Sequence, residues 1–179
     1  MARQSAEEKW RDVLMGEARG HICWSPWMRR FSRAIPSDPR CKLCDHPFGP
    51  PGNITGFFGI GRPSRLNRRI CNGCIRALEK RPGGAEIELS FLFADVRGST
   101  ALAEGMPAEE FSRLMARFYV TASTVVDRVN GIVDKFVGDE VVALFIPGFA
   151  GADHATDAIA AARELLAATR DEDGEPWIR

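Results

Sequence analysis

Long hydrophobic runs are missing from this sequence of 179 residues. The longest apolar stretch, Val141 to Ala152, is interrupted by Pro147, Gly148 and Gly151, and it is shorter than the ~20 residues that a membrane-spanning helix needs. Residues 1–20 are polar and mixed in charge, and they contain no apolar segment of the kind that a secretory signal requires. We therefore expect a cytoplasmic protein with no membrane span.

Net charge is also absent from the chain as a whole, but the two halves carry opposite charges. Residues 1–82 contain 16 Lys and Arg against 7 Asp and Glu, a net charge of +9, whereas residues 83–179 contain 8 against 17, a net charge of −9. The step coincides with Arg81-Pro82-Gly83-Gly84, a sequence typical of a linker. A hydrophobic content of 45% excludes a disordered chain. We predict two domains, residues 1–82 and residues 83–179.

No cysteine follows position 74, and four of the five cysteines form two pairs. Cys41 and Cys44, and then Cys71 and Cys74, have the two-residue spacing that lets both thiolates of a pair reach one ion, with 26 residues between the pairs. In a reducing compartment this favours a metal over disulfides. The interpretation is one structural Zn²⁺, with an iron–sulfur cluster or free thiols as alternatives. Cys23 is interpreted as a small buried apolar residue.

The rest of the N-terminal module is rich in proline and glycine and requires such a cross-link. Helical spacing predicts a short helix over 6–17 and another over 75–80, so the module resembles a treble-clef or zinc-ribbon arrangement. Lone histidines in such loops are more often surface residues, so His21 and His46 are left out of the ligand set.

A basic stretch between the two cysteine pairs has two interpretations. It contains Arg62, Arg65, Arg68 and Arg69, with Phe57 and Phe58 nearby. Nucleic-acid binding is one interpretation. The other, which we favour because the second module is acidic, is docking onto that module, so no nucleic-acid partner is predicted.

The second module alternates strands and helices. Period-two alternation over 87–95 predicts a strand with one fully apolar face. A helix should follow from Pro107 to Gly131, with one apolar stripe: Phe111, Leu114, Met115, Phe118, Ala122, Val125, Val126 and Val129. Two apolar runs, 132–137 and 141–146, flank a hairpin turn.

A further helix over 153–170, capped by Asp153, should bury Ala158, Ile159, Ala162, Leu165 and Leu166. Trp177-Ile178 has the composition of a strand that is just beginning. The order strand, helix, strand, strand, helix, strand matches the split βαβ, or ferredoxin-like, α+β arrangement, with an antiparallel sheet and helices on one face. In that topology the last strand pairs with the first. The expectation is therefore a fragment, with the edge of the first strand covered by further residues or by a second chain.

Two aspartates are the candidate site of this module. Asp95 ends the first strand and Asp139 lies in the hairpin turn, so both carboxylates are expected at one end of the sheet. Two carboxylates leave coordination positions for phosphate oxygens and water, which suits Mg²⁺ or Mn²⁺. Between Asp95 and the next helix, Arg97, Gly98, Ser99 and Thr100 supply charge, backbone N–H groups and hydroxyls for a polyphosphate. The alternative is that Asp95 is only a helix cap and Asp139 only a turn residue.

These residues resemble the class III adenylate and guanylate cyclases. Phe93 to Thr100 matches Phe-x-Asp-x-x-Gly-x-Thr, and Lys135 to Asp139 matches Lys-x-x-Gly-Asp, in the order found in that family. The match covers about 85–179, the first half of such a catalytic domain. The resemblance implies that Asp95, Asp139 and the backbone carbonyl of Val96 bind two Mg²⁺ or Mn²⁺ ions, and that Gly138 lies in the substrate-binding turn.

Lys135 stands where, by the same resemblance, the adenine-recognition residue lies. An ammonium group donates to the acceptor N1 of adenine, whereas guanine N1 and N2 are donors and favour a carboxylate. ATP is therefore the expected substrate, cyclic AMP and pyrophosphate are the products, and the enzyme class is a phosphorus–oxygen lyase in intracellular signal transduction. The alternative for Lys135 is a surface lysine paired with Asp134 or Glu140.

The resemblance also implies a head-to-tail homodimer, with an asparagine and an arginine that stabilise the transition state placed beyond position 179. We therefore expect little cyclase activity from this chain alone. The alternative function is a non-catalytic signalling or nucleic-acid-binding zinc protein with a cyclase-like dimerisation surface. A diguanylate cyclase ranks last because its Gly-Gly-acid-acid-Phe hairpin is missing.

Overall fold

The computed structural model describes residues 5–17, 34–50, 61–64 and 68–178. It divides into two compact units, residues 1–87 and residues 88–179. None of its described helices is long and apolar enough to cross a membrane. Cys23, His21, Phe57, Phe58 and Arg65 lie outside the described residues.

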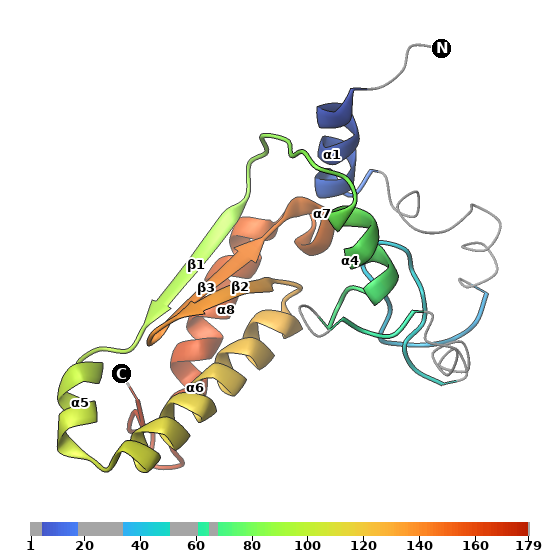
Figure 1. Cartoon of the computed structure of the whole chain (residues 1–179). Helices are drawn as coiled ribbons and strands as arrows, with labels where there is room; N and C mark the ends of the chain where they lie inside the picture. The colour runs from blue at the N-terminus through green and yellow to red at the C-terminus, as the bar shows by residue number, and fades with distance from the viewer. Residues whose placement is uncertain (1–4, 18–33, 51–60, 65–67, 179) are drawn as a thin grey trace. The chain divides into compact units, whose positions relative to one another are not determined.

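The described residues of the first unit include helices α1 and α4 (Figure 1). Helix α1 (Ala6–Met15) begins with a capping box, in which Ser5 accepts a hydrogen bond from the Glu8 amide and Glu8 accepts one from the Ser5 amide. It ends at Gly16, which has the left-handed conformation that favours glycine. Helix α4 (Asn72–Glu79) begins three residues earlier than the helix predicted over 75–80 and takes Cys74 into its first turn.

The second unit is a mixed α/β structure with a small antiparallel sheet (Figure 1). Its elements, in chain order, are β1 (Ser90–Asp95), α5 (Ser99–Gly105), α6 (Ala108–Arg128), β2 (Ile132–Val137), β3 (Glu140–Phe145), α7 (Pro147–Ala150) and α8 (His154–Ala168). The strand order is β1-β3-β2, with both pairings antiparallel. The central strand therefore comes last in sequence, after the hairpin that joins it to β2.

The core lies between the sheet and helices α6 and α8. The predicted stripe of α6 supplies five of its buried residues: Met115, Phe118, Ala122, Val125 and Val126. From β3, the alternate residues Val141, Ala143 and Phe145 face the same core. The prediction that α6 has one continuous buried face is thus confirmed.

The end of α6 differs from the sequence prediction, in which Gly131 stops the helix. The residue with left-handed backbone is Asn130, at φ 60°, rather than Gly131. Gly131 is required for space instead, because a β-carbon there would lie 2.7 Å from Val126 Cγ1 and 2.8 Å from Phe145 Cε1.

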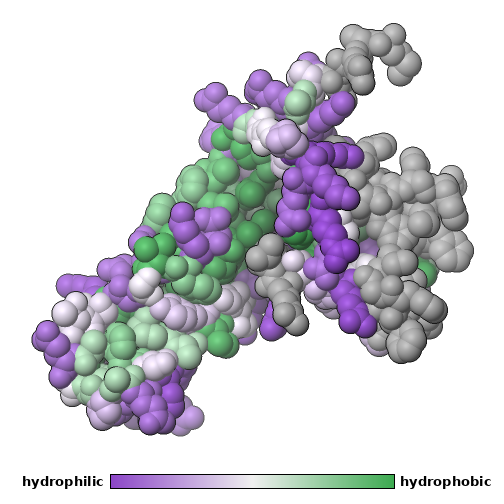
Figure 2. All heavy atoms as spheres, viewed as in Figure 1, coloured by the Kyte–Doolittle hydropathy of each residue, from purple (hydrophilic) through white to green (hydrophobic). Residues whose placement is uncertain are grey.

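An apolar face of the sheet points away from the core. On β1, Leu92 and Ala94 pack against the core, whereas Phe91 and Phe93 stack on each other on the opposite face and are 54% and 62% exposed. The fully apolar face of this strand is therefore its open face. Figure 2 shows apolar residues gathered over the strands.

Helix α8 buries a different stripe from the one predicted. Ala158, Ala161 and Leu165 are buried, but Ile159 and Leu166 are 56% and 69% exposed, so the prediction was wrong for these two. Asp153 occupies the N-cap position without a side-chain capping bond.

The last described residues form no strand. Arg170 and Pro176 make an isolated bridge, and Ile178 enters the core. The prediction of a strand at Trp177-Ile178 was wrong. Within the part of the chain that the structure describes, no strand pairs with the outer edge of β1.

Candidate metal centres

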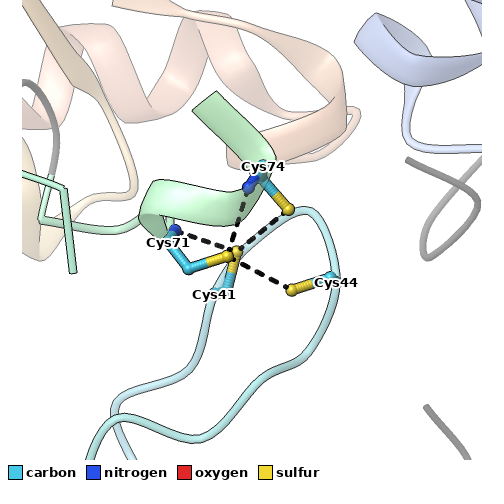
Figure 3. Close-up of side chains that lie close together, drawn as sticks. All are labelled: Cys41, Cys44, Cys71 and Cys74. Carbon is cyan, nitrogen blue, oxygen red and sulfur yellow. Dashed lines mark hydrogen bonds between the residues drawn. The ribbon is translucent and has the colours of Figure 1, made fainter. Parts of the chain in front are cut away.

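The four paired cysteines converge in the first unit (Figure 3). All four Sγ atoms are buried and lie within 4.8 Å of one another. The Cys41–Cys74 and Cys44–Cys71 sulfurs are 3.9 Å and 3.7 Å apart. A tetrahedral ion with metal–sulfur bonds of ~2.3 Å places its sulfurs about 3.8 Å apart. The cluster therefore has the dimensions of a site for a single tetrahedral ion.

Local backbone structure explains this convergence. The first pair lies in a tight turn, in which the Asp45 amide donates to the Cys41 carbonyl and the Cys41 amide to the His46 carbonyl. The second pair lies at the beginning of α4, where Cys71 is the N-cap residue and its sulfur accepts a hydrogen bond from the Cys74 amide at 3.4 Å. The Cys71 amide donates to the Cys41 sulfur at 3.3 Å.

These contacts favour thiolates. Hydrogen bonds from Cys44, the largest effect, and from Cys74 lower the pKa of Cys41, against the opposing effects of Cys71 and of burial. The positive end of the α4 dipole also favours negative charge at Cys71. Thiolate is the form that binds zinc. An iron–sulfur cluster spreads its thiolates over separate iron atoms, so the short distances favour a single ion.

His46 is buried, which corrects the expectation of a surface histidine, and burial lowers its pKa. It is not part of the four-sulfur cluster. A β-carbon at Gly61 would lie only 1.9 Å from His46 Nε2, and Gly61 has φ +80°. The absence of a side chain at position 61 therefore makes room for the histidine ring.

The two aspartates of the second unit lie at the same end of the sheet. Asp95 is the last residue of β1 and pairs in register with Glu140, the residue after Asp139. A hydrogen bond from Ser99 is the largest cause of the lowered pKa of Asp139, and contacts with its own amide and with Asp95 add to it. Asp95, Ser99 and Asp139 are therefore in one cluster, and their oxygen ligands suit a hard divalent cation.

The backbone beside this cluster is anchored to the core at one residue. The Val96 side chain, directly after Asp95, is buried in the core. Gly98 has φ 71° and precedes α5, so Ser99 is the first residue of that helix rather than its cap. Arg97 and Thr100 are exposed beside it.

Lys135 lies on β2 and is exposed. Its Nζ is 3.6 Å from Asp134 Oδ2, an exposed pair of the kind that contributes little to stability. The residue pairing of β2 with β3 shifts between Val133 and Lys135. The resulting register sets Lys135 opposite Val142 and therefore on the open face of the sheet.

Sequence reasoning missed two residues at this end of the sheet. Glu140 stands opposite Asp95, and its place next to Asp139 was the available signal. Tyr119 of α6 donates a hydrogen bond to the Gly138 carbonyl in the hairpin turn. No local pattern indicates that contact, because it depends on how α6 crosses the hairpin.

No family model matches the chain. An uncharacterized protein of Mycobacterium tuberculosis is 35% identical over 96 residues, which are 50% of this chain and 17% of that protein. An adenylate cyclase of Anabaena cylindrica is 33% identical over 60 residues, 34% of this chain and 12% of that protein. The chain thus spans less than a fifth of the length of these curated relatives.

Among solved structures, the adenylyl cyclase CyaB from P. aeruginosa is similar at 30% sequence identity with a TM-score of 0.41, over 45% of this chain and 44% of that one. A bacterial light-regulated adenylyl cyclase is similar at 24% identity with a TM-score of 0.39, over 45% of this chain and 41% of that one. The proteins with which this chain shares partial similarity thus include bacterial adenylate cyclases.

Proposed function

We propose that residues 83–179 are part of a class III nucleotide cyclase catalytic domain of the adenylate type, acting on ATP. The observation that carries the proposal is the cluster of Asp95, Ser99 and Asp139 at one end of the sheet. The partial identity to a protein named adenylate cyclase supports it. The strand order β1-β3-β2 is also that of a split βαβ, or ferredoxin-like, arrangement.

In this proposal the carboxylates of Asp95 and Asp139 and the carbonyl of Val96 hold the divalent cations. When bound, a pair of Mg²⁺ or Mn²⁺ ions lowers the pKa of the ribose 3′-hydroxyl and neutralises charge on the leaving pyrophosphate. The backbone N–H groups and hydroxyls from Gly98 to Thr100 bind phosphate oxygens, Arg97 adds positive charge, and Gly138 permits the tight turn. Lys135 donates to adenine N1.

The open face of the sheet is the proposed homodimer surface. Phe91 and Phe93 are more than half exposed there, on the same edge strand that carries Asp95. Apolar side chains gathered on one face mark interaction surfaces. The first unit, in the same proposal, is a treble-clef zinc module, because its second cysteine pair lies at a helix N-terminus. The proposed location is the cytoplasm.

ATP binding by the full chain in the presence of Mn²⁺ tests the proposal. Isothermal titration should show binding that needs Mn²⁺ and is at least tenfold weaker in Asp95→Asn and in Asp139→Asn. Asp153→Asn is the matched control, since Asp153 makes no capping bond. Assays for cyclic AMP with the same proteins then test turnover. Mn²⁺-independent ATP binding, or binding unchanged in both site variants, would contradict the proposal.

A second candidate is a non-catalytic zinc protein that uses a cyclase-like dimerisation surface. The exposed pair Phe91 and Phe93 favours it, because those side chains suit a partner surface whether or not ATP binds. Two results together would support this second candidate. The wild-type chain would form a dimer that Phe93→Ser disrupts, and it would show no Mn²⁺-dependent ATP binding.

A further inference from the structure

The turn that carries Asp139 is tied to helix α6 by one side chain. Tyr119 donates a hydrogen bond to the carbonyl oxygen of Gly138, the residue immediately before Asp139. Its ring also packs on Phe136 of β2, with a centroid distance of 4.6 Å. Phe118, the residue before it, is buried in the core, so the helix at this point cannot easily shift. The contact thus joins a rigid part of the core to the hairpin turn.

Gly138 itself restricts the turn very little. Gly138 has φ +63°, a conformation that glycine adopts freely, and a β-carbon there would have no neighbour within 4 Å. The ladder of β2 and β3 closes at Val137 and Glu140, which leaves Gly138 and Asp139 as the two unpaired turn residues. A contact from outside the hairpin therefore acts directly on the two turn residues, in addition to the turn geometry set by the closing pair.

One such contact is the hydrogen bond from Tyr119 to the carbonyl of Gly138. That carbonyl belongs to the peptide bond that joins Gly138 to Asp139, so holding it limits the rotation of this peptide and hence the direction of the Asp139 side chain. Ser99 of α5 also acts on Asp139 and lowers the pKa of its carboxyl group. A ligand that is oriented before the ion arrives binds it more tightly.

We propose that Tyr119 is a positioning residue for the cation-binding carboxylate of Asp139, acting through the Gly138 carbonyl. The inference rests on the proposed function in that Asp139 is taken as a cation ligand. Tyr119 does not contact substrate or cation in this role. Its hydroxyl holds the turn, and its ring contact with Phe136 is a separate contribution that Phe can replace.

Tyr119→Phe tests the inference in the full chain with its four-cysteine site loaded with Zn²⁺. The variant keeps the ring and removes the hydroxyl. Loss of one hydrogen bond of ordinary strength corresponds to about a fivefold change in an equilibrium constant. We expect the Mn²⁺ dissociation constant to rise about fivefold, and amide hydrogen exchange at Gly138 and Asp139 to become faster by a similar factor.

Thr124→Val is the matched control. Thr124 lies on the same helix, and its hydroxyl donates to the Val120 carbonyl without touching the hairpin. This variant should leave both the Mn²⁺ affinity and the exchange at the turn unchanged. Any general weakening of α6 would alter both variants alike, which separates positioning from structural support.

The outcomes distinguish failure of the positioning role of Tyr119 from failure of the proposed function. Wild-type binding of Mn²⁺ that is unchanged in Tyr119→Phe would overturn the inference and leave the proposed function intact. Absence of Mn²⁺ binding at Asp95 and Asp139 in the wild-type chain, seen as no paramagnetic broadening of their resonances, would overturn the proposed function. If the turn then still exchanged faster in Tyr119→Phe, Tyr119 would be only a structural anchor and the positioning role would fail as well.

Discussion

Removing the metal from the four-cysteine site should unfold the first unit and leave the second folded. Among the described residues of 1–87, the buried apolar side chains besides the four cysteines are Leu43 and Ile70. Burying two such side chains contributes about 3 to 6 kcal/mol. A structural zinc ion contributes about 10 to 16 kcal/mol at neutral pH. The metal therefore outweighs the apolar contacts that the structure shows in this unit.

The second unit has an independent core. Its buried cluster draws on α6, α8 and β3, and the fully buried Phe145 belongs to it. None of the four sulfurs contributes to that cluster. We therefore expect chelation to collapse the amide resonances of the described residues before Ile87 and to leave those of β3 and α6 dispersed.

The assay combines elemental analysis with a chelator titration followed by two-dimensional NMR. The protein as purified should contain one zinc ion and be colourless, and Cys44→Ser should lose the metal. Cys23→Ser, which changes a cysteine outside the two pairs, is the matched control and should retain it. Dispersed resonances for 68–80 after complete removal of the metal would refute the reasoning. A visible absorption band would indicate that the site holds iron instead of zinc.

Acid should release the same metal. The pKa of Cys41 is lowered in the folded state, so its thiolate stabilises the fold. This stabilisation is complete at pH values above 9.0, the ordinary thiol pKa. This contribution is lost as the pH falls through the lowered pKa. Protons compete with the ion for the thiolates. Zinc release measured with a colorimetric indicator should therefore increase as the pH is lowered, and release that increases on raising the pH would contradict the assignment.

Three further substitutions give separate tests. Gly131→Ala should lower the free energy of unfolding of the second unit by about 1 to 3 kcal/mol in urea, because the new methyl group would clash with buried Phe145. Gly61→Ala should weaken zinc retention against a chelator, because the methyl group would overlap the His46 ring and φ is +80°. Lys135→Glu should shift nucleotide binding in Mn²⁺ from ATP towards GTP, measured by isothermal titration, because a carboxylate accepts from guanine.

Matched controls are present in the chain. Gly105→Ala and Gly84→Ala place a methyl group where nothing lies within 4 Å, so they should leave the stability of the second unit and zinc retention, respectively, nearly unchanged. If Gly131→Ala and Gly105→Ala lowered the free energy of unfolding equally, crowding at position 131 would not be the cause. If Gly61→Ala and Gly84→Ala changed zinc retention equally, crowding at position 61 would not be the cause. An unchanged ATP to GTP ratio in Lys135→Glu would assign Lys135 to the surface pair with Asp134.

Elements with a strong local pattern were predictable. Helix α6 buries residues at a helical spacing that no strand can reproduce, and the observed helix, Ala108–Arg128, lies within the predicted limits. The β2–β3 hairpin was predictable because two apolar runs flank a Gly-Asp turn. The convergence of the four cysteines followed from their spacing, since each pair already has the geometry of half a tetrahedral site.

Elements whose apolar residues lie on more than one side were not predictable in the same way. Helix α8 is rich in alanine, so its apolar surface extends around most of the helix and the sequence does not indicate which side packs. The structure turns Ala158 and Ala161 inward, where small side chains allow close packing, and leaves Ile159 and Leu166 outside. Strand β1 also has apolar residues on both faces, and the structure places Phe91 and Phe93 on the open face.

The sequence by itself determined the chemistry that is available: thiolates at two-residue spacing, carboxylates at a strand end and in a turn, and a lysine three positions before the turn glycine. These depend on neighbours a few residues apart, so local geometry is sufficient. Tertiary structure alone decided that Ser99 acts on the pKa of Asp139 and that Tyr119 holds the Gly138 carbonyl. Those contacts join segments far apart in the chain, and they exist only because the core fixes how α5 and α6 lie against the hairpin.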